Sequence, residues 1–385
     1  MMEEDGSDVA LKLLHTADWH LGMRFPSFSE EDQLTLMRAR MDVLDRIFGV
    51  AEANSVDAVL CAGDLFDDPV PEEVWWRGLA DKLHGRAWKT RPVFLLPGNH
   101  DPLHGKSLYH PDHAFRRALP SWVHVVDTDD FTYAFGEGAV LHAVPCRTVA
   151  GKSDLWKMLP ARAEGDDRIR VGMVHGQTVD IPGFQTNFPI AHDAAEQRGL
   201  DYLAIGDTHA FREVPPNARF PMVYPSAPEQ TKFGEEDVGY VALVFFPRGR
   251  RRPMIRREKV GRWSWIERTV TAVDELRTLA TAEDLRRTVL RLRLELRVDP
   301  EGYAEVERLL RVLAGTDATH GRVGVMQCER SGLELDTKDI EAAFDDLPEV
   351  LQATVARLRA AESDARREVA QRALYHLYRL VREAR

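Results

Sequence analysis

Five apolar segments of this chain each lead into residue types that bind metal ions, and this recurrence limits the possible folds more than any other feature. The segments, 11–14, 58–62, 92–96, 169–174 and 202–205, have the composition of buried strands. The residues that follow them are, in order, Asp18 and His20, Asp64 and Asp67, Asn99 to Asp101, His175, and Asp207 and His209. Ligands of layered α/β folds bind at the carboxyl ends of the strands, so these residues predict one shared site.

The segments between the strands predict the layering. Residues 31–54 carry apolar side chains at three- and four-residue spacing, as in an amphipathic helix, and a second helix is expected from about 71 to 84. This β-α-β-α-β order predicts a layered α/β fold. Three closely spaced strand-like segments, 122–127, 131–135 and 139–146, predict hairpins and a second, antiparallel sheet.

We expect four parts along the chain: a disordered tail (1–10), a catalytic domain (11–260), a small α+β unit (261–335) and a helical segment (336–385). The apolar stripes of the last segment fit either packing on its own domain or docking of a partner protein. Six of the ten residues 248–257 are arginine. This basic hairpin is either a solvated turn or a contact for phosphate groups.

Composition excludes some classes of protein. Because no apolar segment approaches the roughly 20 residues of a membrane helix, no membrane span is expected. The formal charge of −11 is unlike that of a nucleic-acid coat protein. A nucleic-acid substrate stays open, because a metal pair adds about four positive charges to that sum. The three cysteines, Cys61, Cys146 and Cys328, are far apart, which indicates a reducing cytoplasm rather than a disulfide framework.

The candidate metal ligands offer nitrogen and oxygen donors and no thiolate. They are Asp18, His20, Asp64, Asn99, His175, Asp207 and His209. This set is too large for one tetrahedral zinc ion and suits two divalent ions such as Mn²⁺, with Mg²⁺ as the alternative. Two ions roughly 3.5–4 Å apart require a bridging carboxylate.

His100 is the candidate catalytic imidazole, since it lies next to the ligand Asn99 and is not needed as a ligand itself. There it could stabilise charge that develops on the phosphoryl group or protonate the leaving oxygen. Asp101 is expected to orient His100 and is assigned to the catalytic set with it. His104, His110 and His113 follow in a loop that is either solvated or in contact with substrate. The set predicts hydrolysis of a phosphoester by metal-activated water.

The motifs Asp-x-His, Gly-Asp-x-x-Asp, Gly-Asn-His-Asp, His-Gly and Gly-x-x-His, in this order, resemble those of the calcineurin-like metallophosphoesterases. Within that superfamily the chain is similar to the SbcD-type DNA repair exonucleases, through Gly-Asp-Leu-Phe at 63–66, Tyr-Pro-Ser-Ala-Pro-Glu at 224–229 and Phe233-Gly234. The resemblance implies a four-layer αββα sandwich with a small α+β capping domain and C-terminal helices. It also implies two manganese ions, a DNA substrate, an SbcC-like ATPase of the SMC family as partner, and a homodimer formed partly by the early helices.

The resemblance further implies a role for each site residue. One ion would take Asp18, His20, Asp64 and His209, and the other Asp64, Asn99, His175 and Asp207, with Asp64 as the bridge and His100 as the catalytic imidazole. Two residues depart from the pattern of these nucleases, because Asp207 and Asp67 stand where histidine is usual or frequent. Since Asp207 adds a third anionic ligand, we expect a shifted pH dependence and a preference for hard ions such as Mn²⁺ or Mg²⁺.

The leading interpretation is a two-metal DNA exonuclease and endonuclease subunit that acts with an ATPase in double-strand-break repair and recombination. One alternative is a stand-alone phosphodiesterase that acts on small nucleotides with the same metals. The other is a weakly active, dimeric scaffold for the ATPase. Activity on DNA and on a small diester, together with metal content, distinguishes the three.

Overall fold

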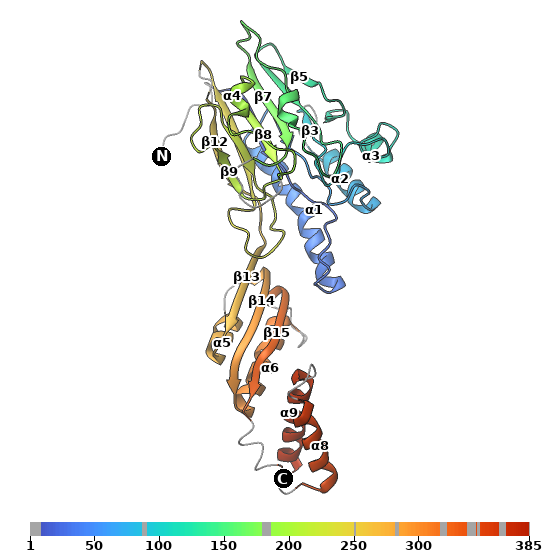
Figure 1. The fold of residues 1–385 in the computed structure, drawn as a ribbon, viewed down its shortest axis with the longest axis vertical. Coiled ribbons are helices and arrows are strands. Elements are labelled where there is room, and N and C mark those ends of the chain that lie inside the picture. Colours follow the sequence, from blue (N-terminus) through green and yellow to red (C-terminus); the bar gives the residue numbers. More distant parts are fainter. Residues whose placement is uncertain are drawn as a thin grey trace. The chain divides into compact units, whose positions relative to one another are not determined.

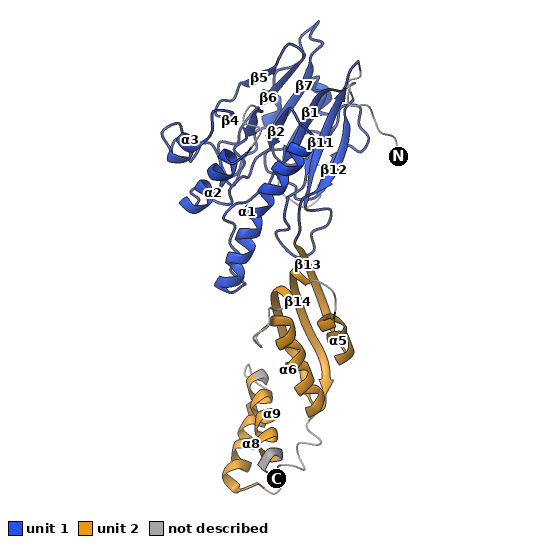
Figure 2. Cartoon of the chain, turned by 180° about the vertical axis from the view of Figure 1, so that it is seen from behind, with its two compact units in different colours: residues 1–262 blue, residues 263–385 orange. Residues whose placement is uncertain are grey.

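The computed structural model describes residues 9–86, 91–178, 186–249, 252–281, 285–315, 322–336, 344, 347–361 and 367–384. It divides into two compact units, residues 1–262 and 263–385 (Figure 2). Most of the expected tail lies outside the described residues, but Val9 already belongs to the first strand.

The first sheet of unit 1 has the strand order β12-β11-β1-β2-β3-β4 (Figure 1). Its strands are β1 (Val9–Thr16), β2 (Ala58–Cys61), β3 (Val93–Leu95), β4 (Val123–Val125), β11 (Tyr240–Pro247) and β12 (Met254–Lys259). The strands β1 to β4 are parallel, whereas β11 and β12 form an antiparallel hairpin that pairs with β1. Parallel neighbours need crossover connections, and the helices between the first three strands provide them.

The second sheet has the order β5-β6-β7-β8-β10-β9. Its strands are β5 (Phe131–Phe135), β6 (Ala139–Ala143), β7 (Ile169–His175), β8 (Tyr202–Gly206), β9 (Phe211–Val214) and β10 (Met222–Pro225). The prediction of an antiparallel sheet is wrong, because only β5 and β9 at the edges run antiparallel to their neighbours. A long crossover, which includes the 3-10 helix η2 (Leu155–Met158), makes β6 and β7 parallel.

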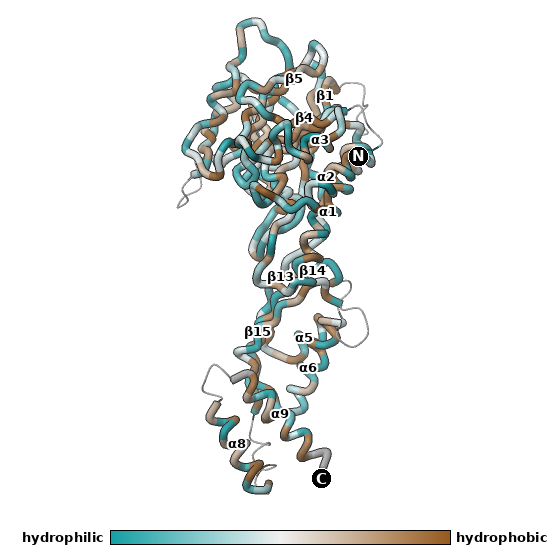
Figure 3. The backbone as a smooth tube through the Cα atoms, turned by 90° about the vertical axis from the view of Figure 1, so that its right-hand side faces the viewer, coloured by the Kyte–Doolittle hydropathy of each residue, from teal (hydrophilic) through white to brown (hydrophobic). Residues whose placement is uncertain are grey.

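Side-chain alternation places the two sheets face to face. In β2, Ala58 and Leu60 face the core between the sheets, and Val59 and Cys61 face the core beneath the helices. The helices α1 (Glu30–Ala53) and α2 (Glu73–His84) cover the first sheet, and η2 with α4 (Ala194–Gln197) covers the second. A short helix, α3 (Ala114–Ala118), precedes β4. Apolar stretches of the tube coincide with strands such as β1 and β4 (Figure 3). This layering confirms the predicted αββα sandwich.

The helix α1 illustrates how the local sequence sets an element. The Ser29 hydroxyl accepts a hydrogen bond from the Asp32 N–H at 3.2 Å and caps the helix, whose first turn is acidic. One face of the helix is apolar, with Ile47 and Phe48 fully buried against the first sheet. The same buried face contains a cation, Arg40.

Unit 2 is built on three parallel strands, β13 (Ser264–Val270), β14 (Leu285–Val298) and β15 (Val323–Leu335). Its helices are α5 (Val273–Thr281), α6 (Pro300–Ala314), α8 (Glu349–Ala361) and α9 (Arg367–Ala384). Leu374 and Tyr375 of α9 belong to the same apolar core as Leu292 of β14 and Val306 of α6. The C-terminal helices therefore pack on their own unit. Among the helices that the structure describes, none is long and apolar enough to cross a membrane.

Candidate metal centre

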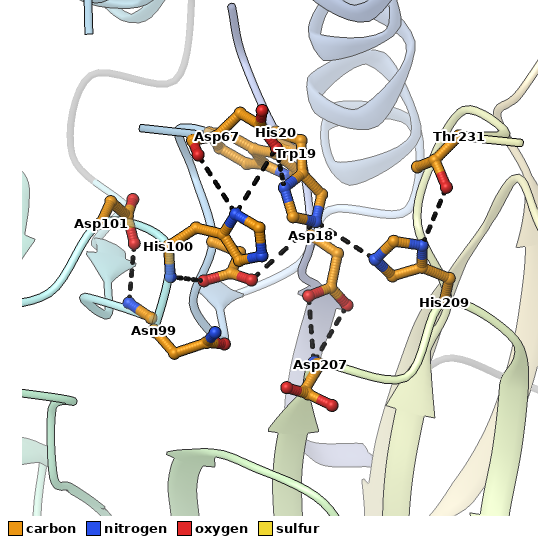
Figure 4. Close-up of polar contacts among 12 residues, drawn as sticks. Asp18, Trp19, His20, Asp67, Asn99, His100, Asp101, Asp207, His209 and Thr231 are labelled. Carbon is orange, nitrogen blue, oxygen red and sulfur yellow. Dashed lines mark hydrogen bonds and ion pairs between the residues drawn. The ribbon is translucent and has the colours of Figure 1, made fainter. Parts of the chain in front are cut away.

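The candidate ligands come together at one end of the two sheets of unit 1. Figure 4 shows Asp18, His20, Asn99, Asp207 and His209 of this set. The candidate ligands follow β1 (Asp18, His20), β2 (Asp64), β3 (Asn99) and β8 (Asp207, His209), or end β7 (His175). Four of the side chains are buried, and Asn99, Asp207 and His209 are partly exposed. The cluster can therefore be reached from solvent past these last three.

Backbone strain is concentrated at these ligands. The φ angles are 55° at Asp18, 45° at His20, 52° at Asp64 and 104° at Asp207. Residues other than glycine rarely adopt positive φ, and each such residue costs about 1–3 kcal/mol. Main-chain hydrogen bonds of 3.0 Å, from Asp18 N–H to the Gly63 carbonyl and from His20 N–H to the Asp64 carbonyl, hold two of them in place. Strain of this kind typically marks a functional site.

Two glycines allow the loops of the centre to approach one another. A Cβ atom at Gly98 would lie 2.1 Å from Asp64 Oδ1, and one at Gly206 would lie 2.2 Å from the Ala62 carbonyl oxygen. The close approach lets the His100 N–H donate a 2.9 Å hydrogen bond to Asp64 Oδ1. Larger side chains at either glycine would push the strand ends apart.

One group of donors surrounds the space between His20 and His209. His20 Nδ1 lies 3.0 Å from Asp67 Oδ1, and His209 Nδ1 lies 2.9 Å from Glu235 Oε1. Because carboxylates only accept hydrogen bonds, each Nδ1 carries the proton and each Nε2 carries a lone pair. The two Nε2 atoms face each other at 3.2 Å, with the Asp18 carboxylate nearby (Figure 4). Two imidazole nitrogens at this distance, beside a carboxylate, would suit a shared cation.

A second group surrounds His175. Its Nδ1 donates a 2.8 Å hydrogen bond to the Ala62 carbonyl, so its Nε2 faces the centre. That Nε2 lies 2.8 Å from Asn99 Oδ1, 3.4 Å from Asp64 Oδ2 and 3.8 Å from Asp207 Oδ1. Burial alone would lower the pKa of His175, but the Asp64 carboxylate outweighs it and raises this pKa to about 10. The surroundings of His175 thus also favour a positive charge.

Asp64 lies between the two groups. Its Oδ2 is 3.4 Å from His175 Nε2 and 3.9 Å from His20 Nε2, a position that suits a carboxylate shared by two ions. Burial raises the pKa of Asp18 to about 6, so a nearby cation would stabilise the charged form of this carboxylate. The donor set therefore fits two divalent cations with oxygen and imidazole ligands.

His100 lies at the exposed rim, and its side chain is 44% exposed. Its Nδ1 is 3.1 Å from the Asp67 carbonyl oxygen and 3.6 Å from Asp67 Oδ1. The imidazole predicted to be catalytic thus lies edge-on against the His20 ring, with 4.8 Å between the ring centroids, and the rest of it faces solvent. Its orientation comes from Asp67, which also receives the Nδ1–H of His20.

Asp101 does not have the orienting role that was expected. Its buried carboxylate accepts hydrogen bonds from the Phe66 N–H at 3.0 Å, the Gly98 N–H at 2.8 Å and the Tyr109 hydroxyl at 2.6 Å. The Asp101 side chain points into the core and fixes the turn that carries Asn99. The imidazole of His100 points outward instead. Asp101 therefore supports the loop rather than the imidazole.

Sequence reasoning missed the groups that hold His209. Thr231 and Glu235 both contact its Nδ1, and Glu235 lies 26 residues further along the chain. Although burial favours the neutral acid, hydrogen bonds from His209 and Thr231 lower the pKa of Glu235 to about 2. An acidic residue in a polar loop gives no local signal of this role.

The arginines of the hairpin β11–β12 have local partners. Arg252 donates to the Asn217 and Ala218 carbonyls, Arg256 donates to Asn54 Oδ1 at 2.7 Å, and Arg257 lies 3.1 Å from Asp237. These contacts favour the solvated-turn interpretation for these three arginines. Residues 250 and 251 lie outside the described residues.

The three histidines after the catalytic turn also have local roles. At His104, His110 and His113, Nδ1 accepts a hydrogen bond from the backbone N–H two residues later, at 3.3, 3.3 and 3.1 Å. Each ring thus stabilises a turn of its own loop, which favours a structural role over contact with substrate.

Comparison with known proteins gives a consistent result. The family model for the calcineurin-like phosphoesterases matches residues 11–211, more than half of the chain. The chain is 35% identical over 147 residues to the SbcD subunit of the nuclease SbcCD of Rhodobacter capsulatus (37% of this chain, 33% of that protein). It is 34% identical over 95 residues to the SbcD subunit of the same nuclease of Bacillus subtilis (24% and 22%). It is 25% identical over 242 residues to the uncharacterized metallophosphoesterase YhaO of Bacillus subtilis (60% and 56%). In each case the match spans less than two thirds of the relative.

Proposed function

The chain belongs to the calcineurin-like phosphoesterase family, and we propose that it is a metal-dependent DNA nuclease with exonuclease and endonuclease activity. We further propose that it acts in the cytoplasm as a homodimer, with an SbcC-like ATPase, in the repair of double-strand breaks. The observation that carries the proposal is the pair of imidazole lone pairs, on His20 and His209, that face each other at 3.2 Å beside Asp18. Similarity to the SbcD subunits of two SbcCD nucleases supports DNA as the substrate.

The residues divide the work of hydrolysis between them. Asp18, His20, Asp64 and His209 would hold one ion, and Asp64, Asn99, His175 and Asp207 the other, with Mn²⁺ favoured and Mg²⁺ the alternative. When bound, such ions polarise a phosphoryl oxygen and lower the pKa of water. His100, at the exposed rim and held by Asp67, would donate a proton to the leaving oxygen or stabilise negative charge on the phosphoryl group.

The test is cleavage of end-labelled single- and double-stranded DNA by the purified chain in Mn²⁺, beside a small bis-ester of phosphate that contains no nucleotide. His100→Ala should lower the rate about 10²–10⁴-fold without loss of bound metal, because it removes an acid–base group rather than a ligand. His104→Ala is the matched control, since this exposed histidine stabilises only its own turn.

The other outcomes would contradict the proposal. Turnover of the small diester alone would favour a phosphodiesterase of small nucleotides. Bound metal with no turnover of either substrate, even when an SbcC-like ATPase is added, would favour the scaffold.

A further inference from the structure

Arg40 carries a guanidinium group into the interior of unit 1, behind the centre. It lies on α1 and is 2% exposed. Its Nη1 donates a 3.0 Å hydrogen bond to the Trp19 carbonyl, and its Nη2 donates to the carbonyls of Glu229 and Gln230 at 3.4 and 3.2 Å. The group lies 6.0 Å from the ring centroid of Phe25. Burial of a charge costs free energy, so a buried guanidinium needs interactions that offset this cost.

The first carbonyl belongs to the turn that carries two of the candidate ligands. Trp19 lies between Asp18 and His20, both of which have positive φ. The Trp19 indole N–H donates a 2.9 Å hydrogen bond to Thr16 Oγ1, so its ring is fixed separately from its carbonyl. The bond from Arg40 therefore acts on the strained backbone that aims His20 at the centre.

The other two carbonyls belong to the loop that holds the third ligand. Gln230 directly precedes Thr231, whose N–H and hydroxyl donate to Glu235 at 2.7 and 2.6 Å. Glu235 in turn accepts the Nδ1–H of His209. One guanidinium thus ties the turn of His20 to the loop that orients His209, although these segments are far apart in the sequence.

We propose that Arg40 is a positioning residue that sets the separation of His20 and His209, and through it the affinity of this half of the centre for its ion. The inference rests on the proposed metal-dependent function. Within the described part of the chain, the hydrogen bonds of Arg40 reach only the carbonyls named above and not Asn99 or His175. The half of the centre around those two residues should therefore keep its affinity when Arg40 is changed.

The positioning role of Arg40 and its charge predict opposite effects of a substitution on metal affinity. A guanidinium near a cation site repels the cation, so removal of its charge alone would strengthen metal binding. Loss of the tie between the two segments would weaken it, because groups that hold a ligand in place typically contribute 10–100-fold to metal affinity. Arg40→Met removes both charge and tie, whereas Arg40→Lys keeps the charge but cannot reach both segments with a planar fork.

The experiment is titration of the metal-free chain with Mn²⁺ by calorimetry, followed by electron paramagnetic resonance of the loaded protein. In both Arg40 variants one of two Mn²⁺ should bind about 10–100-fold more weakly, and the other as in the native chain. At one equivalent of bound Mn²⁺ the variants should give the hyperfine signal of an isolated ion, and the signal of a coupled pair should need about 10–100-fold more free Mn²⁺ in the variants than in the native chain.

Arg170→Met is the matched control. Arg170 is also 2% exposed and also donates to backbone carbonyls, those of Pro160 and Arg198. It lies at the start of β7, at the opposite end of the strand from His175. A variant there should lose stability and keep both metal affinities. If Arg40→Met does not fold, Arg40→Lys answers the question, since it keeps the charge and most of the length of the side chain.

The two levels of the proposal fail in different ways. Two Mn²⁺ bound by the Arg40 variants with native or higher affinity would overturn the positioning role and leave the proposed function intact. A native chain that binds no Mn²⁺ would overturn the proposed function itself. Equal weakening of both sites, matched by Arg170→Met, would show general destabilisation and would also overturn the positioning role.

Discussion

Acid should destabilise unit 1 through His142, a residue of β6 that is remote in sequence from the candidate ligands. Its side chain is nearly buried, and its Nδ1 lies 3.0 Å from Thr132 Oγ1. Burial, together with the nearby charges of Arg170 and Arg168, lowers the pKa of His142 from 6.5 to about 4. The folded protein therefore binds this proton less readily than the unfolded chain does.

The sign and size of the effect follow from this difference. Because the folded pKa lies below the unfolded one, the contribution is complete above pH 6.5 and is lost as the pH falls toward 4. The full difference corresponds to at most about 3 kcal/mol. Between pH 7.5 and 5, about 1–2 kcal/mol of unfolding free energy should be lost once solvent screening is allowed for.

The assay is urea denaturation in EDTA at about pH 7.5 and about pH 5, with the native chain and His142→Asn. Asparagine keeps a polar atom near Thr132 and does not titrate, and other acid-sensitive groups contribute equally to both proteins. The native chain should lose about 1–2 kcal/mol more than the variant between the two pH values. Equal losses would refute the assignment of acid sensitivity to His142.

Three further substitutions test the centre. Gly98→Ala should lower the rate of hydrolysis about 100-fold, because the new Cβ would clash with Asp64 and displace the catalytic turn. Gly105→Ala, which has open space around it, should keep native kinetics. Similar rates for the two variants would contradict the packing argument. Asp67→Asn should weaken Mn²⁺ binding roughly 10-fold in calorimetry, since it removes the charged acceptor of the His20 Nδ1–H, and unchanged binding would exclude that role. Asp207→His should shift the pH–activity profile and should weaken the preference for hard ions, because a neutral ligand replaces an anionic one. Identical profiles would refute the expectation.

Most candidate ligands of the centre could be predicted from the sequence, because each lies in a short pattern of neighbouring residues. Each ligand ends an apolar strand or lies in the loop just after one, as with Asp18 after β1 and His175 at the end of β7. Parallel strands bring such ends to the same edge, so the structure gathers residues that a linear pattern had already marked. The helix expected over 31–54 is likewise found, as α1, because its apolar spacing covers many turns.

The parts that sequence could not give depend on contacts between distant segments. Nothing in the strand composition of β6 shows that, after its hairpin with β5, a long crossover makes it parallel to β7. Adjacency also misled, because Asp101 is next to His100 in the chain while Asp67 is next to it in space. Arg40 contacts the Trp19 carbonyl and Glu235 contacts His209 across 21 and 26 positions of sequence, separations that no local pattern records.

The positive φ angles at Asp18, His20, Asp64 and Asp207 have a consequence for how this protein can evolve. At each of these positions glycine would relieve strain, so the residues that make the centre are poor choices for the stability of the metal-free fold. Selection for stability alone would remove them. A descendant released from its catalytic duty should therefore lose these four side chains early and become harder to unfold as it does so.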